Sequence, residues 1–247
     1  MSPRITLAVA GRVLVQLRRD HRTLAIMLVL PCALMTLLWW MFDDAPGPVD
    51  QFQKLAPGLL AIFPFIVMFL VTSVTTLRER SSGTLERLLA MPMGKLDFLL
   101  GYAIAFGLVA AVQSAAAVLL SVGALGLDIE GGVWLLTVVA VVDAVLGSAL
   151  GLFVSAFART EFQAVQFMPA VVVPQILLCG LFMSRPLMPD VLEAISNVLP
   201  LSYAVDAMTA VRDDTATGDV WGDLGIVAAF VLAALALGAG TLRRRSD

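Results

Sequence analysis

Long apolar runs without Lys, Arg, Asp or Glu recur along the chain and constrain its fold more than any other feature. A helix needs about 20 apolar residues to cross a bilayer, because the hydrocarbon core is roughly 30 Å thick. The run around 134–157 is interrupted only by Asp143, so we count it as one crossing. The sequence predicts six spans, at about 24–42, 57–77, 98–125, 134–157, 162–184 and 224–242.

The composition is that of a membrane protein. The chain is 60% hydrophobic and 14% charged, whereas soluble domains are about 45–50% apolar and about 25% charged. Cys32 and Cys179 both fall inside predicted spans and form neither a disulfide framework nor a metal-binding spacing, so we interpret them as small apolar side chains. The expected fold class is an all-α membrane protein whose single transmembrane domain covers residues 1–247.

The basic residues are sorted to one side of the predicted bundle. When the side alternates at each span, 13 of the 16 basic residues share the side of both termini. The positive-inside rule places that side in the cytoplasm, and an odd number of spans would have destroyed the sorting. The 13 residues are Arg4, Arg12, Arg18, Arg19, Arg22, Arg78, Arg80, Arg87, Lys95, Arg159, Arg243, Arg244 and Arg245.

The opening segment 3–22 has the pattern of an amphipathic surface helix. Its five arginines fall within an arc of about 120° when each residue turns by 100°. We expect this helix in the inner headgroup layer, with its arginines toward anionic lipid, and a soluble amphipathic helix is the alternative. The opposite side carries Leu7, Val9, Ala10, Val13, Leu14 and Leu17.

The charged segment 78–97 separates the second and third spans. Thr84 can cap a helix of about two turns, roughly 10 Å long, which Pro92 ends. Leu85, Leu88 and Leu89 fall on one side of it. Because so short a helix is unstable alone, we expect it to dock on another surface or to lie on the lipid headgroups. The flanking side chains are free for polar contacts: Glu79, Arg80, Glu86 and Arg87.

A few polar residues lie inside the predicted spans. An ionised Asp143 costs about 3 kcal/mol on the insertion scale, so it marks either a transport path or proton site, or a neutral or hydrogen-bonded carboxyl that joins helices. Gly147 and Gly151 have the spacing that lets two helices approach closely. The candidate substrate path comprises Gln113, Asp143, Gln166 and Gln175.

The outer segment 185–223 predicts two short helices. Residues 191–199 have helical spacing, and a second helix over 203–211 follows Pro200 with Ser202 as its cap. Both are too short to cross the membrane. We therefore expect re-entrant helices that dip into the outer leaflet and cover the exit of the spans.

The sequence contains no motif for covalent chemistry. Gly94 and Lys95 lack the other residues of a phosphate-binding loop. A single histidine, His21, and the absence of a His, Cys and carboxylate cluster predict neither a metal site nor a nucleophile. The arginines at 243–245 are expected to anchor the last span instead of binding nucleic acid. Movement must then be powered by a gradient or by a partner.

Two motifs resemble those of permease subunits of ABC-2 type exporters, particularly the daunorubicin-resistance-like branch. RERSSGTLERL, from Arg78, is similar to their inner loop after the second span, and LPLSYAVDAM, from Leu199, is similar to the motif before their last span. The resemblance implies ATPase-coupling residues Glu79, Arg80, Gly83, Thr84, Leu85, Glu86, Arg87, Leu88 and Leu89. The outer re-entrant motif comprises Pro200, Ser202, Tyr203 and Asp206.

The resemblance also implies a mechanism and partners. A separate ATPase subunit would bind ATP and Mg and receive the coupling helix 83–89, and a second permease copy or a paralogue would complete the complex in a bacterial plasma membrane. The expected cargo is a hydrophobic or amphipathic small molecule such as a drug, an antibiotic or a lipid-like compound. The alternatives are a lipid-linked or polysaccharide cargo, a proton-coupled secondary transporter using Asp143, and a scaffold. The sequence contains no inverted repeat of broken helices, which argues against the secondary transporter.

Overall fold

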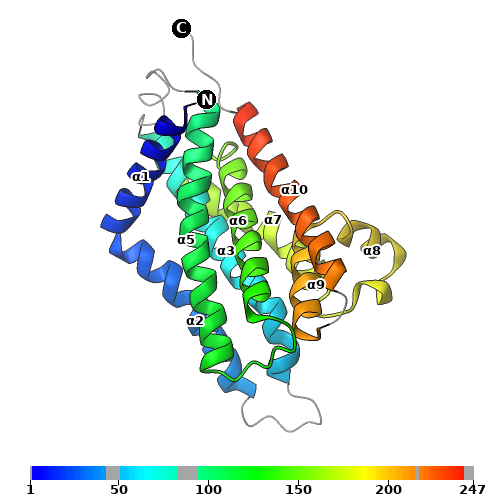
Figure 1. The fold of residues 1–247 in the computed structure, drawn as a ribbon. Coiled ribbons are helices and arrows are strands. Elements are labelled where there is room, and N and C mark those ends of the chain that lie inside the picture. Colours follow the sequence, from blue (N-terminus) through cyan, green and yellow to red (C-terminus); the bar gives the residue numbers. More distant parts are fainter. Residues whose placement is uncertain (1, 43–50, 83–93, 215–216, 242–247) are drawn as a thin grey trace.

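The computed structural model describes residues 2–42, 51–82, 94–214 and 217–241, and every regular element in these ranges is helical (Figure 1). The all-α membrane fold is thereby confirmed. The elements are α1 (Pro3–Arg19), α2 (His21–Phe42), α3 (Gln51–Ser81), α5 (Lys95–Gly123), α6 (Val133–Val154), α7 (Glu161–Leu178), the 3-10 turn η1 (Arg185–Leu187), α8 (Asp190–Ser196), α9 (Pro200–Arg212) and α10 (Thr217–Thr241).

Six of the helices described are long and apolar enough to cross a membrane: α2, α3, α5, α6, α7 and α10. They match the six predicted spans, with differences of four or more residues at the ends of α3, α7 and α10. α10 begins at Thr217 instead of residue 224. α3 begins at Gln51 instead of residue 57 and ends at Ser81 instead of residue 77. α7 ends at Leu178, before the predicted limit at 184, because the chain turns at Gly180, whose φ of +93 suits a residue without a Cβ.

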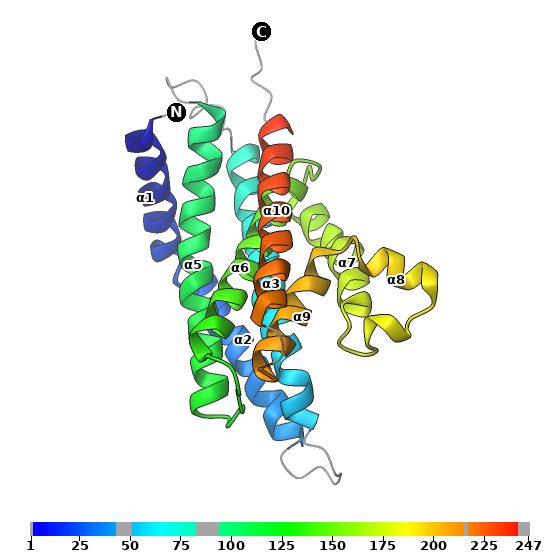
Figure 2. The same ribbon diagram turned by 45° about the vertical axis from the view of Figure 1, so that its right-hand side comes forward.

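The centre of the bundle is the contact between α3 and α6, which lie side by side (Figures 1 and 2). A Cβ built on Gly147 would lie 2.4 Å from the carbonyl oxygen of Phe65, and one on Gly151 would lie 2.5 Å from that of Phe69. Only glycine lets the two backbones approach so closely. The predicted role of these two glycines is confirmed, and α3 is their partner helix.

The start of α1 and the end of α10 lie at the same end of the bundle, which we call the N-terminal end (Figure 1). α3 also ends there and α5 begins there, so the segment that joins them leaves and returns at this end. α2 ends and α3 begins at the opposite end. The helices therefore alternate in direction as an even number of crossings requires.

Helix α1 packs on the protein along the first half of α5 (Figures 1 and 2). A Cβ on Gly101 would lie 2.6 Å from Val9 Cγ1 and 2.9 Å from the Thr6 carbonyl oxygen, so the two helices are in close contact. The helix predicted over 3–22 ends at Arg19, and Arg22 belongs to α2. The face buried in the bundle carries Thr6, Val9, Ala10, Val13 and Leu17.

Candidate coupling region and polar interior

Most of the predicted ATPase-contact residues lie outside the described ranges: Gly83, Thr84, Leu85, Glu86, Arg87, Leu88 and Leu89. The structure does describe the two helix ends that border them, at Ser81 in α3 and Lys95 in α5. Both ends lie at the N-terminal end of the bundle. The side chains in these two turns therefore determine how the segment is attached to the membrane-spanning helices.

Glu79, in the last turn of α3, is buried and paired with α1. Arg12 Nη2 donates hydrogen bonds of 2.8 Å to each carboxylate oxygen of Glu79 and a third of 2.8 Å to Tyr102 Oη in α5. The Glu79 side chain is 5% exposed and that of Arg12 is 34% exposed. The sequence-based expectation that Arg12 faces lipid was wrong, because a buried carboxylate needs a cationic partner. Glu79 does make a polar contact, as expected, and its partner is a residue of this chain.

Asp97, in the first turn of α5, binds the beginning of α1. Its Oδ1 accepts hydrogen bonds from the Ser2 backbone N–H at 2.9 Å and from Thr6 Oγ1 at 3.3 Å. Its Oδ2 accepts the Gly94 backbone N–H at 3.0 Å, which satisfies a free donor at the start of the helix. Helix α1 thus contacts both borders of the 83–93 segment.

The other charged groups near α3's end differ in their partners. Arg78 forms a two-point ion pair with Glu161, with distances of 2.8 and 3.0 Å, which joins α3 to the first turn of α7. Both side chains are more than half exposed, so the pair is worth at most about 1 kcal/mol. Arg80 is partly buried, and its Nε has no hydrogen-bond partner among the residues described.

Three of the four candidate path residues lie in the interior of the bundle. Asp143 is 1% exposed and Gln113 is fully buried, and neither side chain has a hydrogen-bond partner within the described ranges. Ser114 Oγ donates to the Ala140 carbonyl at 3.1 Å, which holds the Gln113 turn of α5 against α6 near Asp143. No hydrogen bond joins Asp143 to a neighbouring helix in this part of the chain.

The two glutamines of α7 differ from each other. Gln175 is buried, and its amide nitrogen donates to the Val171 carbonyl of its own helix at 3.1 Å. Gln166 is exposed at the surface of the bundle, so the structure does not bring it to the interior with Gln113 and Asp143. The hydroxyls of Thr72, Ser73 and Thr76 in α3 are also buried without a partner among the described residues.

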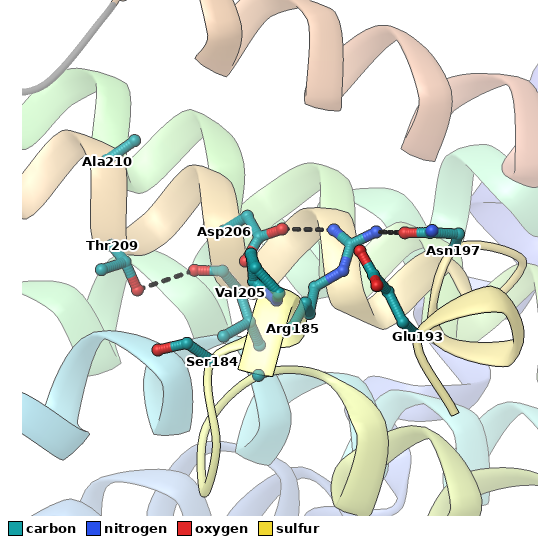
Figure 3. Close-up of a pocket in the computed structure, with 10 residues that line it drawn as sticks. Ser184, Arg185, Glu193, Asn197, Val205, Asp206, Thr209 and Ala210 are labelled. Carbon is teal, nitrogen blue, oxygen red and sulfur yellow. Dashed lines mark hydrogen bonds and ion pairs between the residues drawn. The ribbon is translucent and has the colours of Figure 1, made fainter. Parts of the chain in front are cut away.

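The outer segment is held together by Arg185 (Figure 3). Its guanidinium donates to Asp206 of α9 and to Asn197 after α8, and it lies 4.9 Å from the centre of the Tyr203 ring. Tyr203 in turn donates to the Asn197 carbonyl at 2.7 Å. Arg185, Asn197 and Asp206 border a cavity of about 550 Å³ that Glu193 and Thr209 also line.

The predicted capping role of Ser202 was wrong. Helix α9 begins at Pro200 with Leu199 as its cap residue, because the fixed φ of proline suits the first helical position. Ser202 is buried, and its Oγ lies 3.1 Å from Ser196 Oγ and 3.5 Å from the Leu178 carbonyl at the end of α7. It therefore holds α9 against α7 and α8. The axes of α8 and α9 are bent by 87° relative to each other.

The sequence profile described as ABC-2 type transporter matches residues 5–211, which is most of the chain. The chain belongs to the ABC-2 type transporter family. It is 26% identical over 164 residues to the probable multidrug ABC transporter permease YbhS of Escherichia coli, covering 66% of this chain and 43% of the relative. It is 29% identical over 157 residues to the E. coli inner membrane transport permease YhhJ, covering 62% and 42%.

A relative from Dictyostelium discoideum is also similar over more than half of the chain. ABC transporter G family member 20 of Dictyostelium discoideum is 29% identical over 154 residues, covering 62% of this chain and 21% of the relative. The chain thus spans less than half the length of each of these curated relatives. The family resemblance expected from the two motifs is confirmed.

Sequence reasoning missed the roles of three side chains, among those that join elements of this ABC-2 protein: Arg12, Tyr102 and Arg185. One signal was available for Arg12, which stands between Ala10 and Val13 of the buried face and so borders the apolar side of α1. Arg185 was visible as an isolated basic residue on the acidic outer side, five residues before the helix that starts at 190. Tyr102 carried no signal, because an aromatic residue in a span is usually packing.

Proposed function

We propose that this chain is the membrane-spanning subunit of an ATP-driven exporter that moves a hydrophobic or amphipathic small molecule out of a bacterial cell. A separate ATP-binding subunit binds ATP and Mg, and a second permease copy or a paralogue completes the complex in the plasma membrane. The N-terminal end of the bundle faces the cytoplasm. Family membership and the printed names of two relatives, a multidrug ABC transporter permease and a transport permease, support this function.

The observation that carries the proposal is the position of α3. This helix of 31 residues spans about 46 Å at 1.5 Å per residue, and it leads directly from the cytosolic segment to the opposite end of the bundle. It touches α6 backbone to backbone, and it also packs on α2, α7 and α9. A displacement applied at Ser81 is therefore passed to the helices that would line a cargo path.

The chemistry of the interior favours an apolar cargo. The core between α3, α6, α9 and α10 is built from aliphatic and aromatic side chains, and the buried polar side chains are few. Binding sites for small apolar molecules have this character, with a small number of polar groups that set orientation. A lipid-linked or polysaccharide cargo remains the alternative within the family, and efflux assays with matched cargo panels distinguish the two.

The direct experiment is co-purification with candidate ATP-binding subunits. Co-expression should yield a detergent-stable complex whose ATP hydrolysis exceeds that of the ATPase alone and rises further with cargo. If no ATP-binding subunit from the same genome binds this chain, the proposed function is wrong.

Leu88→Glu tests the docking role of the cytosolic segment. Placing a carboxylate on the expected apolar ridge costs the free energy of desolvating that charge, so efflux and ATPase co-purification should fall by about tenfold or more. Leu88→Met, which keeps size and polarity, is the matched control and should retain both. The amount of protein in the membrane should be equal for the two variants. Survival of both readouts in Leu88→Glu contradicts the docking role.

A proton-coupled transporter is a second candidate because Asp143 is buried without a partner among the described residues. Asp143→Asn preserves shape but cannot exchange a proton. A proton-coupled mechanism predicts that this variant loses efflux and that a protonophore abolishes efflux by the parent. An ATP-driven mechanism predicts that efflux persists with a protonophore as long as ATP is maintained. If Asp143→Asn transports every tested compound normally, Asp143 has no part in the path.

A further inference from the structure

One guanidinium joins three helices at the N-terminal end of the bundle. A single nitrogen of Arg12 in α1 is within 2.8 Å of Glu79 in α3 and of Tyr102 in α5. Glu79 stands four residues before Gly83, where the cytosolic segment begins, and Tyr102 lies two turns into the helix that follows the segment. The link therefore lies beside both attachments of the predicted coupling helix.

The burial of Glu79 makes this link stronger than an ordinary surface ion pair. A carboxylate that is 5% exposed loses most of its hydration, and removal of its only cationic partner within the described residues would leave an uncompensated charge. By contrast, the exposed Arg78–Glu161 pair can open at little cost. The Arg12–Glu79 pair is thus costly to open, whereas the exposed Arg78–Glu161 pair is not.

Two further contacts hold α1 against α5. Asp97 accepts hydrogen bonds from Ser2 and Thr6, and Val9 packs onto Gly101 with no space for a Cβ. Close packing of this kind resists sliding, because any displacement forces atoms into contact. Helix α1 is therefore fastened to α5 along its first half and to α3 at Arg12.

We propose that Arg12 is a positioning residue that makes α1, the end of α3 and the start of α5 move as one body when the cytosolic segment moves. Helix α1 then acts as a brace across the two attachments of the segment, in contrast to an independent helix floating on lipid. Because α1 holds α3 and α5 together, a displacement of the segment moves both helices at once and does not move them apart. This inference rests on the proposed function only in one respect, namely that an ATP-binding subunit moves the segment.

Charge exchange tests the link in the coupled transporter. Arg12→Glu and Glu79→Arg should each lower efflux by about tenfold or more, because each places two like charges together in a buried site. The double variant restores an opposite-charge pair and should recover most of the loss. Arg19→Glu is the matched control, since it makes the same charge change on an exposed position of α1 and should keep efflux.

The brace is wrong if both single variants transport normally. It is also wrong if all three variants reach the membrane in equal amounts and the double variant is no better than the singles. A loss in Arg19→Glu as large as that in Arg12→Glu would assign the effect to the charge of α1 on the lipid surface.

A distance measurement tests the brace without any ATPase. Spin labels at Leu7→Cys on α1 and Ser81→Cys on α3, both at exposed positions, are placed in a chain carrying Cys32→Ala and Cys179→Ala. The parent should give one narrow distance distribution, Arg12→Leu a broad one, and the charge-exchanged double variant a narrow one again. An unchanged distribution in Arg12→Leu overturns the proposal.

The same label pair separates failure of the brace from failure of the proposed function. Leu88→Glu should lose efflux while keeping the narrow α1–α3 distance, because it leaves Arg12 in place. In a complex with its ATPase, ATP should leave this distance unchanged, since the labelled helices belong to one body. A shifted distance on ATP binding contradicts the brace even when export is ATP-driven.

Discussion

At the scale of single residues, the structural role of a residue depends more on the neighbours that it contacts than on its chemical type. Glu79 and Asp143 are both carboxylates that are nearly completely buried in the bundle, but Glu79 meets Arg12 while Asp143 has no partner among the residues described. Gly147 and Gly107 are both glycines in spans, but a Cβ on Gly147 meets the Phe65 backbone whereas one on Gly107 lies 3.6 Å from the end of Val145. Only the neighbours distinguish the members of each pair.

This difference gives a prediction for Gly147→Ala. The added Cβ would lie 2.4 Å from a carbonyl oxygen that cannot move without shifting α3, so the variant should lose about 1–3 kcal/mol of stability. Gly107→Ala is the control and should be neutral or slightly stabilising, because alanine favours the helix and the contact is ordinary. Thermal unfolding in detergent measures both. Equal melting temperatures for the two variants would show that α3 and α6 are not in backbone contact.

At the scale of elements, the break between α1 and α2 is set by Asp20. Its Oδ1 accepts the Thr23 backbone N–H at 3.1 Å and its Oδ2 accepts the Thr23 hydroxyl at 2.6 Å, which is the arrangement of a helix N-cap. The Thr23 side-chain and backbone hydrogen bonds lower the pKa of Asp20 below its ordinary value of 3.8. The cap lets the chain end one helix and start the membrane-spanning one without an intervening loop.

Removal of this cap has a defined pH dependence. Asp20→Ala should destabilise the start of α2 by about 1 kcal/mol at neutral pH, whereas Asp20→Asn should retain most of the cap. Because the pKa of Asp20 is lowered in the folded state, its contribution is present above 3.8 and is lost as the pH falls through the folded-state pKa. Hydrogen exchange of the Thr23 amide measures the effect. A difference between parent and Asp20→Ala that stays constant down to pH 2 would exclude the carboxylate as its source.

At the scale of the whole molecule, the single crossing of α5 puts the charged segment and the loop between α5 and α6 at opposite ends. The N-terminal end carries the attachments of residues 83–93, and the opposite end carries Asp128 and the end of α9, where the Glu130 N–H donates to the Arg212 carbonyl at 2.9 Å. The sorting of basic residues predicts that the N-terminal end is cytoplasmic. This arrangement is necessary for any cytosolic ATPase to act on the chain.

Cysteine labelling in intact cells tests this orientation. In a chain carrying Cys32→Ala and Cys179→Ala, Ser82→Cys should be protected from a membrane-impermeant maleimide and Asp128→Cys should react, since both positions are exposed at their ends. Permeabilised cells should label both. Reaction of Ser82→Cys from outside intact cells would place the coupling segment away from cytosolic nucleotide and contradict the proposed function.

The sequence by itself determined the class of fold, the number of spans, the sorting of basic charge and the close approach of Gly147 and Gly151 to a second helix. Each of these depends on a local quantity: the cost of moving a residue or a short window of residues into lipid, or the size of a side chain. The same reasoning found the two motifs of the family. It did not predict where α7 ends or how α9 begins, since those depend on a turn at Gly180 and on the fixed φ of Pro200.

Only the tertiary structure decided the partners of the charged residues. Helical periodicity placed Arg12 with the lipid-facing arginines and named no partner for Glu79, but the packing of α1 on α5 brings the two together, 67 positions apart in the chain. Arg185 likewise finds Asp206 and Asn197 only when α8 and α9 are folded against each other. Partition into lipid is a property of one segment, whereas the pairing of buried charge depends on which other segment is packed against it.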